Sequence, residues 1–133
     1  MNWRSIRNPL TEADIDNLEH EFQIKLPGDY KSQIGPINGG ALRDAYLTIP
    51  KLGSIPYSRN VSLSKKAQFG IYQMLPSFNE GTIRFFPFGS VGNGDYFCFD
   101  LLNDTVILYL HETETALPIC KTFSELLDML CVE

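Results

Sequence analysis

The chain has 133 residues, of which 44% are hydrophobic and 20% are charged, and its formal net charge is −5. This composition is ordinary for one globular domain, which we place at residues 1–133, and it excludes global disorder. The densest basic pair is Lys65-Lys66, so nucleic-acid binding is disfavoured, because phosphates need a cationic face. No apolar run reaches the roughly 18 residues of a membrane span, so we expect no membrane partner.

The cysteines and the N-terminus indicate a cytoplasmic protein. Cys98, Cys120 and Cys131 are widely spaced, without a CxxC pair or a histidine at metal-ligand spacing. We expect three buried, reduced thiols, and neither a metal nor a cofactor. The first residues also lack the hydrophobic run of a signal peptide.

The first part of the chain is predicted to be helical. Residues 11–24 combine helical spacing of apolar side chains with a capping-box pattern, Thr11 and Asp14. A second, short helix is expected over residues 29–34, where Gly35-Pro36 stops it. Asn38-Gly39-Gly40 then predicts a turn, because these residue types accept positive φ at little cost.

The middle of the chain gives weaker signals. Residues 45–57 look extended, but Pro50 and Pro56 cannot donate to a ladder, so any strand there is short or at an edge. Residues 62–75 fit helical spacing, although Gly70 disfavours a helix, and this segment stays ambiguous.

The last third predicts an antiparallel meander followed by a helix. Strands are expected over residues 83–88, 96–101 and 106–110, joined by a glycine-rich turn at 89–95 and a tight turn at Asn103-Asp104. Thr122 and Glu125 repeat the capping-box pattern before an amphipathic helix. Helices beside an antiparallel meander make the fold class α+β.

No catalytic constellation emerges from the sequence. The segment 89–95 lacks the lysine of a phosphate loop and leads into a strand, so Gly89, Gly92 and Gly94 are interpreted as turn residues with positive φ. A ligand or partner contact at this turn is the alternative. His20 is expected at the surface, and the spacing of His111, Asp95 and Asp100 does not demand a metal.

Several segments together resemble the SUKH superfamily, which includes a yeast regulator of cell-wall assembly and many bacterial immunity proteins. The similar segments are Leu26-Pro27-Gly28-Asp29-Tyr30, Asn38-Gly39-Gly40, residues 86–100, Tyr109-Leu110-His111-Glu112 and residues 122–127. They follow one another in the family's order. Residues 41–82 match no family pattern.

The resemblance implies a central antiparallel or mixed sheet with N- and C-terminal helices packed on it, and no enzymatic activity. It also implies an immunity protein that neutralises a cognate toxin of the nuclease or deaminase type, and an acidic inhibitor suits a basic toxin. A regulatory scaffold in cell-wall synthesis or signalling is the alternative. A third hypothesis is an enzyme or small-ligand receptor that uses a cleft near the glycine-rich turn and His111.

The candidate partner contacts are acidic residues at the turns and end of the meander, where loops carry function. They are Asp95, Asp104, Glu112 and Glu114.

Overall fold

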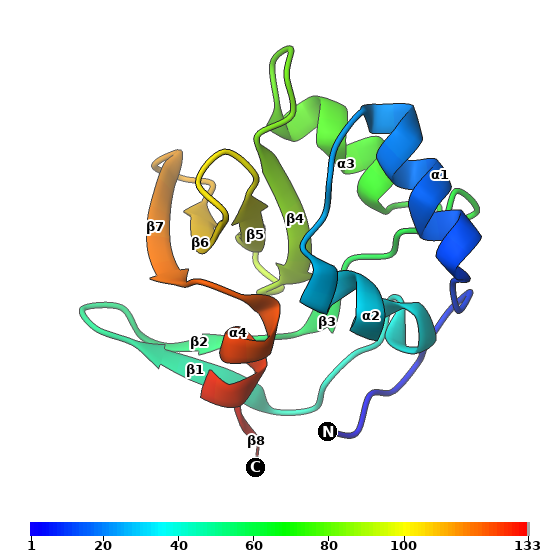
Figure 1. The fold of residues 1–133 in the computed structure, drawn as a ribbon. Coiled ribbons are helices and arrows are strands. Elements are labelled where there is room, and N and C mark those ends of the chain that lie inside the picture. Colours follow the sequence, from blue (N-terminus) through cyan, green and yellow to red (C-terminus); the bar gives the residue numbers. More distant parts are fainter. Residues whose placement is uncertain (133) are drawn as a thin grey trace.

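The computed structural model describes residues 1–132, which contain four helices and eight strands (Figure 1). The helices are α1 (Glu12–Phe22), α2 (Gly28–Ile37), α3 (Ile71–Phe78) and α4 (Phe123–Met129). The strands are β1 (Ala45–Ile49), β2 (Gly53–Pro56), β3 (Arg59–Asn60), β4 (Phe85–Ser90), β5 (Tyr96–Asp100), β6 (Thr105–Leu110), β7 (Thr115–Cys120) and β8 (Cys131–Val132).

The strands form two antiparallel sheets rather than one central sheet. The larger sheet has the order β3-β4-β5-β6-β7 and the smaller one the order β2-β1-β8. Helices α1, α2 and α3 lie along one side of the larger sheet (Figure 1), and α4 connects β7 of the larger sheet to β8 of the smaller one. The α+β class predicted from the sequence is confirmed.

An aromatic cluster forms the centre of the core. Tyr30 of α2 is fully buried, and its ring contacts those of Phe86, Phe88, Phe99 and Phe123 at centroid distances of 4.9 to 6.3 Å. These partners come from β4, β5 and α4, so one side chain joins α2 to the sheet and to the last helix. A bulge at Phe88 lets β4 place this ring beside that of Phe99, at 4.2 Å.

The predicted helices form, but the boundaries of the first two differ from the prediction, and α1 ends at Phe22 rather than at residue 24. Thr11 and Asp14 make the reciprocal capping box of α1. Helix α2 was expected to stop at Gly35-Pro36 but continues through both residues to Ile37. The fixed φ of proline is compatible with a helix, and near the C-terminal end it removes only one hydrogen bond.

The meander is confirmed as β4, β5 and β6, whereas three strands were not predicted. β3 and β8 have two residues each, too few for a periodic pattern. β7 contains Pro118, which lowers strand propensity but is tolerated here because β7 is an edge strand. The ambiguous segment 62–75 is a loop as far as Gly70, and α3 begins at Ile71.

Two buried asparagines, Asn38 and Asn60, connect the region around β3 to the N-terminal segment and to the end of α2. The Asn38 amide nitrogen donates to the carbonyl oxygens of Arg7 and Asn8 at 3.1 and 3.0 Å, while its oxygen accepts from the Leu63 N–H at 2.8 Å. Asn60 accepts from the Tyr57 hydroxyl at 2.6 Å and donates to the carbonyl of Ile37 at 3.1 Å. Backbone hydrogen bonds join the same segments, because Arg4 and Ala41 exchange two of them and the Asn60 N–H donates to the Gly40 carbonyl.

The cysteines are only partly as expected. Cys98 is buried and Cys120 half-buried, but Cys131 is exposed, so the expectation of three buried thiols was wrong for Cys131. It lies on β8, a two-residue strand at the edge of the smaller sheet.

Candidate partner-binding surface

Two turns meet at one end of the larger sheet. The β4–β5 turn (residues 91–95) and the β6–β7 turn (residues 111–114) lie at the same end because β5 and β6 are adjacent and antiparallel. Asp95 Oδ1 accepts a hydrogen bond from the His111 backbone N–H at 3.0 Å and lies 2.6 Å from His111 Nδ1. One carboxylate thus links the two turns.

Glycine permits this arrangement. Gly92 and Gly94 have φ values of +105° and +100°, in the region that favours glycine. A Cβ on Gly94 would lie 3.0 Å from Cε1 of His111, so this residue also makes room for the imidazole. The imidazole therefore packs directly on the β4–β5 turn.

The other glycines of the predicted turns differ in their roles. Gly39 has φ +69°, as a turn glycine requires. Gly40 closes the predicted turn without positive φ, since its N–H donates to the Ile37 carbonyl at 2.9 Å, whereas the expectation of a turn residue with positive φ was wrong for Gly89. Gly89 belongs to β4 rather than to the turn, and its missing side chain leaves space for the ring of Tyr57. Gly40 packs close to Trp3 and to the carbonyl of Ile37.

Three of the four candidate acidic residues come together at this end. Glu112 and Glu114 are exposed in the β6–β7 turn, and Glu114 has φ +50°. The side chain of Asp95 is only 16% exposed, because it is held by His111. We call Asp95, Glu112 and Glu114 the acidic end; its two glutamates face solvent, and Asp95 bonds to His111 of the turn that carries them.

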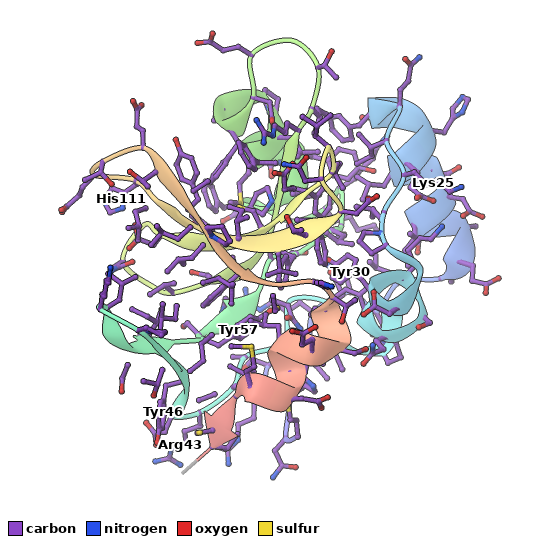
Figure 2. The ribbon with its side chains drawn as sticks, turned by 60° about the vertical axis from the view of Figure 1, so that its left-hand side comes forward. Lys25, Tyr30, Arg43, Tyr46, Tyr57 and His111 are labelled. Carbon is purple, nitrogen blue, oxygen red and sulfur yellow. The ribbon has the colours of Figure 1, made fainter. Side chains whose placement is uncertain are left out.

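Asp104 is not part of the acidic end. It lies in the β5–β6 turn, at the opposite end of β5, with φ +54°. There it borders a depression of about 570 Å³ that Lys25 and Lys121 also line. Figure 2 shows His111 and Lys25 on opposite sides of the molecule. The structure therefore separates the fourth candidate from the other three.

Asp100, which lies close to Asp104 in the chain, has a structural role. Its carboxylate is almost fully buried and receives two hydrogen bonds from the Arg84 guanidinium, at 3.1 and 3.0 Å. The backbone N–H groups of Leu102 and Asn103 donate to it as well. Desolvation raises the pKa of Asp100, but these hydrogen bonds outweigh it, and the net effect lowers the pKa.

The described residues contain no group of three or more histidine, cysteine, aspartate or glutamate side chains that could hold a metal ion. Asp100 is engaged by Arg84, and His111 by Asp95, at opposite ends of β5. Burial raises the pKa of the Cys98 thiol, which favours the unreactive protonated form. His20, expected at the surface, is exposed on α1.

Sequence reasoning missed a basic depression on the other side of the β4–β5 turn. Arg7, Arg59 and Lys66 line a hollow of about 520 Å³. Arg7 is distant in the chain from Arg59 and Lys66, and the three residues form no continuous basic run that the sequence could indicate. The fold brings them together, because Ala41 pairs with Arg4 on one side and with Arg59 on the other, and Asn38 bonds to the carbonyl of Arg7.

The SMI1 / KNR4 family (SUKH-1) matches residues 9–129. The chain belongs to this family. No curated protein and no solved structure gives a match to the chain. The family match includes residues 41–82, for which the sequence alone offered no pattern.

Membership of the SUKH-1 family agrees with the α+β fold and fits a non-enzymatic immunity or regulatory domain with protein partners. Among the described residues, no helix has both the length and the apolar character to cross a membrane.

Proposed function

We propose that this SUKH-1 domain is an immunity protein that binds and neutralises a cognate basic toxin, of the nuclease or deaminase type, in the cytoplasm. The observation that carries the proposal is the acidic end. Two exposed glutamates, Glu112 and Glu114, stand on a turn that the His111–Asp95 contact holds in place. The family match and the net charge of −5 support a protein partner of opposite charge.

The proposed mechanism of toxin binding depends on carboxylates that the fold holds in place. Because the Asp95 carboxylate bonds to His111 at both the backbone and the ring, the turn is ordered before a partner arrives. A preformed contact avoids part of the entropy lost on binding. The negative charge of the acidic end accelerates encounter with a basic surface of the toxin. Occupation of that surface keeps the toxin from its substrate.

Affinity capture of the tagged protein from its native lysate at low salt tests the proposal. We expect one basic toxin-like protein, whose activity falls to zero at a molar ratio of one to one. Recovery of several envelope or signalling proteins without a toxin would contradict it. That result would favour a regulatory scaffold, the alternative function within the same family.

Charge reversal then tests the acidic end. The double substitution Glu112→Lys, Glu114→Lys should weaken toxin binding at least about tenfold, mainly through slower association. Asp104→Lys is the matched control, because Asp104 is also an exposed turn residue with positive φ but lies at the other end of β5. If Asp104→Lys weakens binding and the double variant does not, the interface lies at the other end of the sheet.

A further inference from the structure

The basic depression is unusual for a chain of net charge −5. Three cationic side chains, Arg7, Arg59 and Lys66, line it, and within residues 1–132 no aspartate or glutamate does. None of the three forms an ion pair with a described residue, whereas other cations of the chain do, such as Lys31 with Glu19. Uncompensated positive charge is therefore gathered at one place on an acidic protein.

The walls of the depression are fixed by buried polar groups. Asn38 binds the carbonyl of Arg7 and the backbone N–H of Leu63, so it ties the N-terminal segment to the stretch after β3. Asn60, next to Arg59, is fully enclosed and pairs with the Tyr57 hydroxyl. The backbones that carry the cations are thus held relative to one another. Such preorganisation is typical of a binding site.

The depression adjoins the acidic end. Arg59 of β3 lies opposite Ser90 of β4, and Ser90 lies opposite Tyr96 of β5. Ser90 and Tyr96 both line the depression and also flank the β4–β5 turn, which ends in Asp95. One end of the sheet therefore carries positive charge on the β3 side and negative charge at the β6–β7 turn.

An apolar contact lies within the same hollow. Phe69 is 69% exposed, and Met74 of α3 lines the depression with it. A large exposed aromatic beside cations suits a ligand that combines negative charge with apolar side chains. A bare phosphate would leave the aromatic ring without a partner.

We propose that the basic depression binds an acidic, partly apolar segment of a protein partner. The acidic end a short distance away would repel a nucleic-acid strand, whose charge continues in both directions. A protein segment can place carboxylates in the depression and basic residues at the acidic end, so the two charges together fix its orientation. The inference deepens the proposed function, on which the choice of a protein ligand rests.

A peptide titration of the isolated chain tests the inference. The probe is a capped six-residue peptide of alternating glutamate and leucine. Its binding is measured from the amide chemical shifts of the protein at about 20 mM salt, where screening is weak. We expect saturable shifts confined to Gly39, Ser62, Lys66 and their neighbours. The same peptide with lysine in place of glutamate should leave these amides unchanged.

The triple substitution Arg7→Ala, Arg59→Ala, Lys66→Ala should weaken peptide binding about tenfold, the sum of three modest charge contacts. The matched control is Lys25→Ala, Lys51→Ala, Lys121→Ala, which removes the same charge from exposed positions outside the depression and should leave the affinity unchanged. Circular dichroism establishes that both variants are folded.

Three results would overturn the inference: no saturable shifts, equal loss in the two triple variants, or tighter binding of a six-nucleotide oligothymidylate at the same amides. The last result would assign the depression to phosphate. Because no toxin enters this experiment, its failure would leave the capture and inhibition tests of the proposed function unaffected.

Discussion

The ring of Tyr57 occupies the space in which any side chain at position 89 would stand. A Cβ on Gly89 would lie 2.6 Å from both Cζ and Oη of Tyr57, closer than real Cβ contacts come. The same ring stacks on Phe97 at 5.5 Å, and its hydroxyl donates to Asn60 at 2.6 Å. Gly89 is therefore required by packing, since its φ is not positive.

Gly89→Ala should destabilise the protein by at least about 2 kcal/mol. The added methyl group must displace the buried ring of Tyr57, which Phe97 and Asn60 hold in place. Chemical denaturation measures the effect. Gly28→Ala is the matched control, since a Cβ there meets nothing within 4 Å, and in a helix alanine should be neutral or mildly stabilising. Equal effects of the two substitutions would contradict this account of Gly89.

Tyr30 and Tyr57 give opposite predictions for the same substitution. Both are fully buried, but within residues 1–132 the Tyr30 hydroxyl has no hydrogen-bond partner, whereas that of Tyr57 bonds to Asn60. Tyr30→Phe should be neutral or stabilise the fold by up to about 1 kcal/mol, and Tyr57→Phe should destabilise it by about 1–2 kcal/mol. Thermal unfolding of both variants checks the difference, and destabilisation by Tyr30→Phe would show that its hydroxyl is bonded.

Asp100→Asn should cost about 2–3 kcal/mol at neutral pH, because an amide nitrogen would face the Arg84 and Asn103 donors. The folded state lowers the pKa of Asp100, so the unfolded chain binds more protons in acid. The stabilisation of the fold by the ionised Asp100 carboxylate is fully present above the ordinary carboxyl pKa of about 3.9. It is lost as the pH falls through the lowered pKa that Asp100 has in the folded state.

Urea unfolding of the wild type and of Asp100→Asn at a series of pH values measures this dependence. The gap between their unfolding free energies should be constant from neutral pH to about pH 5 and should shrink below about pH 4. A gap that stays constant into strong acid would mean that the carboxylate is not specifically stabilised. Asp104→Asn, at an exposed turn position, serves as the control and should show a small, pH-independent effect.

The three thiols should react at very different rates. Cys131 is exposed and should react first with a disulfide reagent, and Cys131→Ser should abolish that fast phase. Cys120 is half-buried, and desolvation together with Glu125 raises its pKa to about 11, so its reaction should need higher pH. Cys98 should react only on unfolding, and two fast thiols at neutral pH would contradict the structure.

The sequence by itself determined the elements that rest on local chemistry. Thr11 and Asp14 mark the start of α1 because a capping box needs only residues three apart. The alternating aromatics of β4 and β5, with Gly92 and Gly94 between them, specify a hairpin for the same reason. Short-range patterns of this kind also carried the resemblance to the SUKH superfamily.

The tertiary structure decided what depends on residues distant in the chain. It divided the strands over two sheets, and it showed that Gly89 makes room for Tyr57 rather than forming a turn. It separated Asp104 from Glu112 and Glu114, because successive turns of a meander lie at alternate ends of the sheet. It also gathered Arg7, Arg59 and Lys66 into one depression through Asn38 and Asn60. Contacts between segments so far apart leave no periodic trace in the sequence, and only packing can bring such residues together.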